Sequence, residues 1–357
     1  MRRTDARVVV ASRNPPRSWR YNPRITLASC DRDDAEGLAR LSLQCAVLAH
    51  FAGPFYELPI EPLHAAAEAG ANYVDVAEDR EFGRRVRGLA GPVRAAGIAA
   101  LSGLSVVPGM EVLFAEMFRP HMDEITSFRG FAAPDTRRHR GRAIFETMMH
   151  GVGTSFRLPR RGRYEQVRGW SEGEWVRFPP PLGKRLVYLV LEMADADVLP
   201  EMFGVQTVEF KAGSEWALLN RMLSLAGSIR ARTGHPKWER YTDLVRAISW
   251  AIGRFGKNRG GVVFEIGGRA NGQPLTHRVA VVGEREGGRI PSVLAAIAVE
   301  EMLAGRLTGT GLLSLRDWIA PERLLEFLGE RGLRVLWLPQ GGTRWRPFSL
   351  DQLSPGF

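Results

Sequence analysis

The first 120 residues alternate between short apolar runs and longer helix-forming stretches. The apolar runs are rich in β-branched and small residues, which is typical of buried strands. The stretches between them carry helix formers and, in several cases, acidic residues at their start. Strands are predicted at 7–12, 25–30, 45–51, 72–77 and 98–105, and helices at 31–44, 60–70, 80–97 and 110–118. Strands separated by helices in this way predict a parallel sheet covered on both faces.

The pattern changes after residue 122, where the segments become longer and more aromatic. Residues 185–193 and 205–213 read as strands, and 261–284 reads as a hairpin that turns at Asn271-Gly272. Antiparallel strands with helices predict a second, α+β domain over 123–290. The predicted fold is therefore α/β, with a Rossmann-like parallel-sheet domain over 1–122 that is incomplete at its N-terminus.

Two further helices close the chain, at 292–305 and 320–332. We expect residues 291–335 to pack back on the first domain. The stretch 336–357 is rich in Pro, Gly and Arg and is expected to form a surface tail.

Helical patterns at 214–232 and 238–256 are apolar enough for contact with a membrane surface or with a second copy in a homodimer. Burial within the domain is the default expectation for both. No apolar run reaches the roughly 18 residues that a membrane span needs, so no transmembrane span is predicted. The N-terminal apolar run is too short for a signal peptide.

Composition is that of a soluble globular protein, with 357 residues, 45% hydrophobic and 25% charged. Two cysteines exclude a disulfide framework and favour a cytoplasmic location. The net charge is +10, but only four basic residues are lysine and the arginines are spread along the chain. Without an accompanying motif, this bias predicts no specific nucleic-acid partner. The seven histidines show no metal-ligand spacing, so no metal is assigned.

The segment HFAGPFYELPIEPLHAAAEAGANYVDVAEDREF (50–82), followed by AAGIAALSGLSVVPGMEVL (95–113), resembles the saccharopine dehydrogenase-like family of NAD(P)-binding oxidoreductases. The family pattern runs through a Gly-Pro-Phe turn, a helix, a Tyr-x-Asp strand, an acidic pair and a strand ending before Pro-Gly. Its counterparts here are Gly53-Pro54-Phe55, Gly70 to Asp75, Glu78-Asp79 and Gly103 to Pro108. A weaker resemblance continues through the second domain, so it covers most of the chain.

One departure from the family is the lack of a strand followed by Gly-x-Gly-x-x-Gly near the start. That turn would offer backbone N–H groups and a helix N-terminus to the pyrophosphate. The chain instead begins with what resembles the family's second strand. The expectation is a start codon assigned too late. The alternative is a non-catalytic binding or scaffold protein on a degenerate Rossmann domain.

The predicted adenosine end of the cofactor site follows the first two strands. Ser12, Arg13 and Asn14 end the first of them without a carboxylate. A guanidinium there suits a 2′-phosphate, which favours NADP over NAD, although a solvated turn arginine is the alternative. Asp31 stands where the family places an adenine-contacting acid, or it is the N-cap of the next helix.

The predicted nicotinamide end follows two other strands. The turn Phe51-Ala52-Gly53-Pro54-Phe55 would contact the cofactor through its backbone, and Gly103 and Ser105 would lie beside the reactive ring. The resemblance places the acidic corner at 75–79 near the cleft, whereas a solvated loop is equally consistent with the residues. It implies hydride transfer to or from a small-molecule substrate, and no catalytic residue can be assigned by motif.

Overall fold

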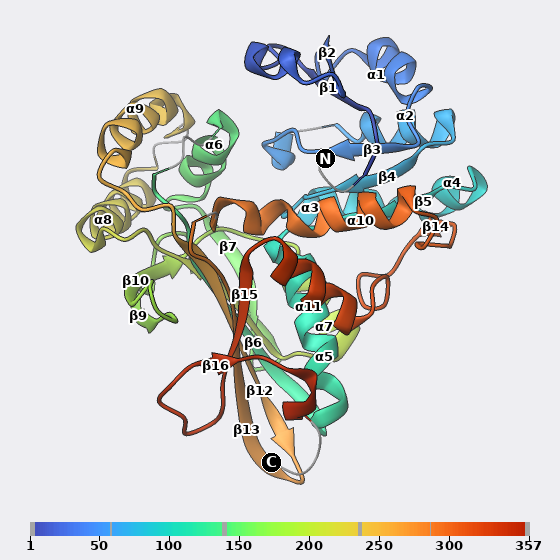
Figure 1. The fold of residues 1–357 in the computed structure, drawn as a ribbon. Coiled ribbons are helices and arrows are strands. Elements are labelled where there is room, and N and C mark those ends of the chain that lie inside the picture. Colours follow the sequence, from blue (N-terminus) through green and yellow to red (C-terminus); the bar gives the residue numbers. More distant parts are fainter. Residues whose placement is uncertain (1–3, 58, 138–140, 235–237, 286, 354–357) are drawn as a thin grey trace.

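The computed structural model describes residues 4–57, 59–137, 141–234, 238–285 and 287–353 (Figure 1). Its N-terminal part holds two parallel sheets and the helices that cover them. A much larger, curled sheet occupies the remainder, and α10 (Val293–Leu303) lies between the two parts. The α/β fold class predicted from the sequence is confirmed.

The N-terminal strands lie close to their predicted positions, but they form two parallel sheets and not one. β1 (Val8–Ser12) pairs in parallel with β2 (Ile25–Ser29). A second parallel sheet has the order β14-β5-β4-β3. Its members are β3 (Val47–His50), β4 (Asn72–Asp75), β5 (Ala99–Leu101) and β14 (Gly311–Leu312). Among the described residues no strand joins β1 to β3, so the parallel strands form two separate sheets.

The helices of this part include several whose ends are set by a capping aspartate or by a glycine. The helices are α1 (Ala35–Ser42), α2 (Glu61–Ala69), α3 (Arg80–Gly88), α4 (Ala90–Ala95) and α5 (Glu111–Phe118). Asp34 and Asp79 cap α1 and α3 by accepting from backbone N–H groups of the first turn. Gly70, at φ +68°, ends α2 in the left-handed conformation that glycine tolerates. The single helix predicted over 80–97 is interrupted at Leu89 and forms α3 and α4.

The second part is built on an eight-stranded sheet of order β16-β15-β13-β12-β6-β11-β10-β9. The central pair β6–β11 is parallel and its other neighbours are antiparallel. The predicted hairpin is confirmed: Asn271 and Gly272 have φ of +50° and +72° and join β12 to β13. The strands are β6 (Glu124–Ala133), β9 (Glu174–Arg177), β10 (Lys184–Leu189), β11 (Thr207–Ala212), β12 (Gly260–Ala270), β13 (Gln273–Gly283), β15 (Leu333–Leu338) and β16 (Arg346–Pro347), with β7 (Ser155–Arg160) and β8 (Arg163–Arg168) forming a separate ribbon.

Helices surround this sheet and connect it to the N-terminal part. They are α6 (Arg142–Gly151), α7 (Asp195–Phe203), α8 (Ala217–Thr233), α9 (Thr242–Gly253), α10 and α11 (Pro321–Glu330). The main core is formed where α5 and α10 meet one face of the large sheet. There Phe264 lies 5.5 Å from Phe114 and 5.7 Å from Phe128 between ring centroids, and all three are fully buried. α10 also packs on β3 and β4, so this core holds the two parts together.

The default expectation for α8 and α9 is wrong, because each turns an apolar face to solvent. Leu218 and Leu225 of α8 are 70% and 64% exposed, and Leu244 of α9 is 59% exposed. No described helix is long and apolar enough to cross a lipid bilayer.

Candidate functional site

The carboxyl ends of the parallel strands carry most of the sequence-predicted site residues. The strand registers set Ser12 level with Ser29, His50 level with Asp75, and Val74 level with Leu101. In open α/β sheets, ligands bind beyond this edge. The loops that follow these strands therefore form the candidate site.

The adenosine end lies on the β1–β2 sheet. Arg13, Asn14 and Asp31 are exposed, and Ser12 is half-buried. Backbone and side-chain contacts hold this edge: Cys30 donates its N–H to the carbonyl of Ser12 at 3.2 Å, and the Ser29 hydroxyl donates to the carbonyl of Arg13 at 3.4 Å.

The interpretation of Asp31 as a helix N-cap is wrong. Asp34 caps α1 and accepts from the N–H of Gly37 at 2.9 Å. Asp31 instead accepts from the N–H of Asp33, at 3.3 Å. Its exposed carboxylate is therefore not engaged in capping that helix.

The turn after β3 presents backbone to solvent at its start and anchors itself by aromatic packing at its end. Phe51 is 52% exposed and Ala52 is exposed, whereas Pro54 is buried. The Phe55 ring lies 5.2 Å from His50 and 5.1 Å from Phe82, both in edge-on geometry. Burial lowers the pKa of His50 to about 4, so its imidazole is neutral near pH 7.

Helix α6 of the second part closes over this turn. A Cβ added to Gly53 would lie 3.2 Å from the Cβ of Ala143, so the turn approaches α6 as bare backbone. The ring of Tyr56 stacks on His150 at 4.2 Å, and His150 Nδ1 lies 3.0 Å from Glu239. Burial raises the pKa of Tyr56, which therefore remains protonated at neutral pH. Sequence reasoning did not pair Tyr56 with His150, because only the fold brings α6 to this turn.

The arrangement of the neighbouring loops depends on one buried carboxyl group. Asp75 is fully buried, and its Oδ1 accepts from the N–H groups of Ala77 at 2.9 Å and Gly103 at 2.8 Å. Gly103 has φ of +83°, and a Cβ there would lie 3.0 Å from the ring of Pro108. Asp75 thus fixes the loops after β4 and β5 to each other. Because Asp75 is fully buried, the alternative interpretation of a solvated loop does not hold for this residue.

A group of buried carboxyls lies where these loops meet the second part. The Ser105 hydroxyl donates to Glu78 Oε1 at 2.6 Å, so the side chain of Ser105 is engaged inside the protein. Glu111, at the start of α5, is fully buried, and neither of its carboxyl oxygens has a partner among the described residues. Asp195, at the start of α7, is 2% exposed.

The carboxyls of this group influence each other's protonation. Burial raises the pKa of Asp195 to about 7, its own backbone hydrogen bonds oppose the rise, and nearby Glu78 adds to it. Burial raises the pKa of Glu111 well above its usual range, and the charges of Asp195 and Glu78 act in the same direction. Burial also raises the pKa of Glu78, opposed by the Ser105 hydroxyl. Asp195, with a pKa of about 7, can therefore carry a proton near neutral pH.

Ion pairs fix α7 against the N-terminal part beside this group. Arg80 of α3 donates to Glu192 at 2.5 Å and also to Asp197, and Arg84 donates to Asp197 at 2.9 Å. The N–H of Ala194 donates to the carbonyl of Glu78 at 2.9 Å. Sequence reasoning missed Asp195 because no local signal marks it, whereas Glu111 stands two residues after the matched Pro108-Gly109 and could have been found.

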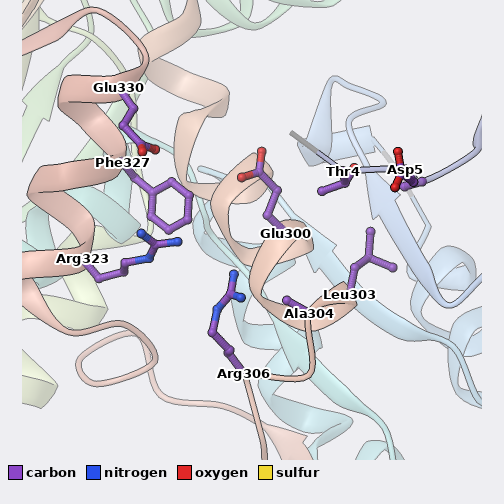
Figure 2. A pocket seen from close by; sticks show the side chains of 10 residues that line it. Thr4, Asp5, Glu300, Leu303, Ala304, Arg306, Arg323, Phe327 and Glu330 are labelled. Carbon is purple, nitrogen blue, oxygen red and sulfur yellow. The ribbon is translucent and has the colours of Figure 1, made fainter. Parts of the chain in front are cut away.

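A cavity of about 570 Å³ lies away from these strand ends (Figure 2). It is lined by Thr4, Asp5 and Ala6, which precede β1, and by the facing parts of α10 and α11. It therefore opens at the amino end of β1, opposite to the edge where α/β sheets bind ligands. Arg306 of its lining is ion-paired with Glu301 of α10 at 2.8 Å. We do not assign it as the functional site.

Comparison with solved structures shows the fold of this chain. It is similar to apo saccharopine dehydrogenase (L-Glu forming) from Saccharomyces cerevisiae, with a TM-score of 0.63, 16% identity and 94% of each chain covered. A DAP dehydrogenase from C. glutamicum in complex with DAP matches at a TM-score of 0.42, with 14% identity over 91% of this chain and 99% of that one. No family model matches the sequence. No curated protein matches it either.

The structure thus has a saccharopine dehydrogenase-like Rossmann fold, as the Gly-Pro-Phe and Tyr-x-Asp motifs predicted. At 16% identity, the likeness establishes the fold alone.

Proposed function

We propose that the chain is an oxidoreductase that binds a nicotinamide dinucleotide, NADP in preference to NAD, and transfers hydride to or from a small-molecule substrate. The observation that supports this most is that exposed polar residues and bare backbone follow the carboxyl ends of the parallel strands in both N-terminal sheets of a dehydrogenase-like fold. A cytoplasmic location accords with the low cysteine content.

The residues of this edge fit the two ends of such a cofactor. At the β1–β2 end, Arg13 is exposed beside Ser12 and Asn14, with no carboxylate among them. A guanidinium pairs with phosphate through parallel hydrogen bonds, so Arg13 is suited to a ribose 2′-phosphate. Asp31 would contact the adenine side.

At the other end, the turn from Phe51 to Phe55 offers backbone groups without side-chain bulk at Gly53. Gly53 lies close to Ala143 of α6, so the second part of the chain lies against this turn. Gly103 and Ser105 follow the neighbouring strand and would adjoin the nicotinamide. A bound nicotinamide cofactor supplies or accepts the hydride.

The chain itself would handle the accompanying proton. Asp195 has a carboxyl whose pKa is raised to about 7, so near neutral pH it can both hold and release a proton. The hydroxyl of Ser105 donates a hydrogen bond to Glu78, and this bond connects the loop after β5 to the carboxyl of Glu78. We propose Asp195 as the group that holds and releases the proton, and Ser105 as the residue that positions the neighbouring Glu78.

Fluorescence titration of the folded chain with NADPH and NADH tests the proposal. We expect saturable binding with NADPH preferred, and a smaller preference in Arg13→Ala because the 2′-phosphate loses its partner. The matched control is Arg344→Ala, which removes an exposed arginine from the loop before β16. Equal loss in both variants would refute the role of Arg13.

A non-catalytic binding protein is the second candidate. It is consistent with the same fold, because a fold does not by itself specify an activity. Failure of the folded chain to bind either nucleotide would support it over the oxidoreductase.

A further inference from the structure

Helix α8 carries a continuous apolar stripe on its solvent side. Leu218, Met222, Leu225 and Ile229 are 70%, 57%, 64% and 49% exposed. Their spacing of four, three and four residues sets them on one face of the helix. The opposite face is anchored in the protein, since buried Asn220 donates to the carbonyl of Leu186 at 2.9 Å. The side of α8 that carries Asn220 therefore packs on the protein, and the apolar stripe is an additional face of the helix that no described residue covers.

Helix α9 repeats the same arrangement. Leu244 and Ile248 are 59% and 46% exposed, and Phe255, just beyond the helix, is 83% exposed. With exposed Ala251 they follow the same four-three-four spacing. α9 is held in place through α6, where Arg142 donates to Asp243 at 2.9 Å. In Figure 1, α8 and α9 lie on the same side of the molecule, away from β1 to β5.

Basic and aromatic residues border these stripes. Between residues 214 and 259 there are nine basic and three acidic residues, so this segment supplies +6 of the net charge of +10. Arg221 and Arg232 each follow a stripe residue of α8 by three positions, which makes them its neighbours on the helix surface. Beside α9, the guanidinium of Arg254 lies 4.3 Å from the ring centroid of Trp250, which is 49% exposed.

We propose that the exposed faces of α8 and α9 form a docking surface for an anionic lipid bilayer. Apolar side chains with Trp and Phe would enter the headgroup region, while arginines at the border would contact lipid phosphates. Charge decides between this occupant and a second copy of the chain. A symmetric dimer through this surface would bring two patches of the same positive sign together, which is unfavourable, whereas an anionic bilayer is complementary.

Vesicle flotation of the full chain tests this proposal. The vesicles contain phosphatidylcholine alone or phosphatidylcholine with phosphatidylglycerol. We expect flotation with the anionic vesicles, weakened when NaCl rises from about 0.05 M to about 0.5 M. The variant Leu218→Gln/Leu225→Gln should lower the partition coefficient about tenfold. The variant Arg221→Gln/Arg232→Gln should lower binding to the vesicles that contain phosphatidylglycerol and leave binding to phosphatidylcholine vesicles unchanged.

The matched control is Leu43→Gln, which changes a leucine that is 71% exposed at the end of α1. It should float like the unchanged protein, and thermal melting should show that all variants are folded. Absence of flotation, or equal flotation of Leu218→Gln/Leu225→Gln and the unchanged protein, would overturn the proposal. A dimer in light scattering that the Leu218→Gln/Leu225→Gln variant dissociates, without lipid binding, would also overturn it and assign the surface to a second copy.

Discussion

Asp75 Oδ1 accepts a hydrogen bond of 2.8 Å from the backbone N–H of Gly103 and thereby connects the loops that follow two neighbouring strands. Both groups are buried, and the same oxygen also accepts from Ala77. The local geometry of the candidate site therefore depends on a carboxylate that has no access to solvent. The contribution of Asp75 can be measured as a change in the free energy of unfolding.

Replacement of Asp75 by Ala should destabilise the protein by about 3 kcal/mol, because two buried N–H groups lose their acceptor. Asp75→Asn retains an oxygen at this position and should cost less. Urea denaturation monitored by circular dichroism gives both values. If Asp75→Ala unfolds at the same urea concentration as the unchanged protein, Asp75 does not hold these loops.

The pKa of Asp195, raised to about 7 from an ordinary value of 3.8, predicts a dependence of stability on pH. Between about pH 4 and pH 7 the folded protein keeps this proton while the unfolded chain has released it, so stability falls as pH rises. Asp195→Asn should remove a part of this fall worth roughly 2–4 kcal/mol. Glu78 and Glu111, whose pKa values are also raised, would leave a residual slope.

Denaturation at several pH values measures this effect. Glu57→Gln, which changes an exposed carboxyl, is the control and should keep the slope of the unchanged protein. An unchanged slope in Asp195→Asn would show that this carboxyl does not carry a proton near neutral pH.

Gly53→Val should weaken nucleotide binding about tenfold and lower the free energy of unfolding by about 1–3 kcal/mol. The new side chain would meet Ala143 and force the turn away from α6. Gly91→Val is a suitable control, because a Cβ at Gly91 of α4 meets nothing within 4 Å. The comparison uses the NADPH dissociation constant of each variant. Equal affinity in both variants would mean that the turn does not adjoin the cofactor.

The strand positions of the N-terminal part could be predicted because each strand has a local signature, whereas their division into two sheets could not. Uniformly apolar runs marked the buried strands, and Asn271-Gly272 marked the hairpin through its left-handed backbone. The break at Leu89 was not predicted, although Gly88 and Gly91-Pro92 flank it. A proline inside a helix lacks the backbone N–H that bonds to the preceding turn, so a local signal for the break was present in the sequence.

The site was predictable only in so far as its residues follow strands. Ser12 to Asn14 and Phe51 to Phe55 do so, and the parallel order brings their strand ends to a sheet edge. Asp195 and His150 reach the site from helices of the second part, over distances along the chain that no local pattern encodes. The apolar stripes of α8 and α9 were visible as helical periodicity, but their exposure depends on which face meets the sheet.

Hydrogen–deuterium exchange of the chain with and without NADP⁺ tests the central claim most directly, because it reports where the cofactor binds. The account predicts slower exchange of backbone amides at 12–14, 51–53 and 103–105, with no change in the cavity at 300–306. Absence of any protection, or protection confined to the cavity beside α10, would contradict it.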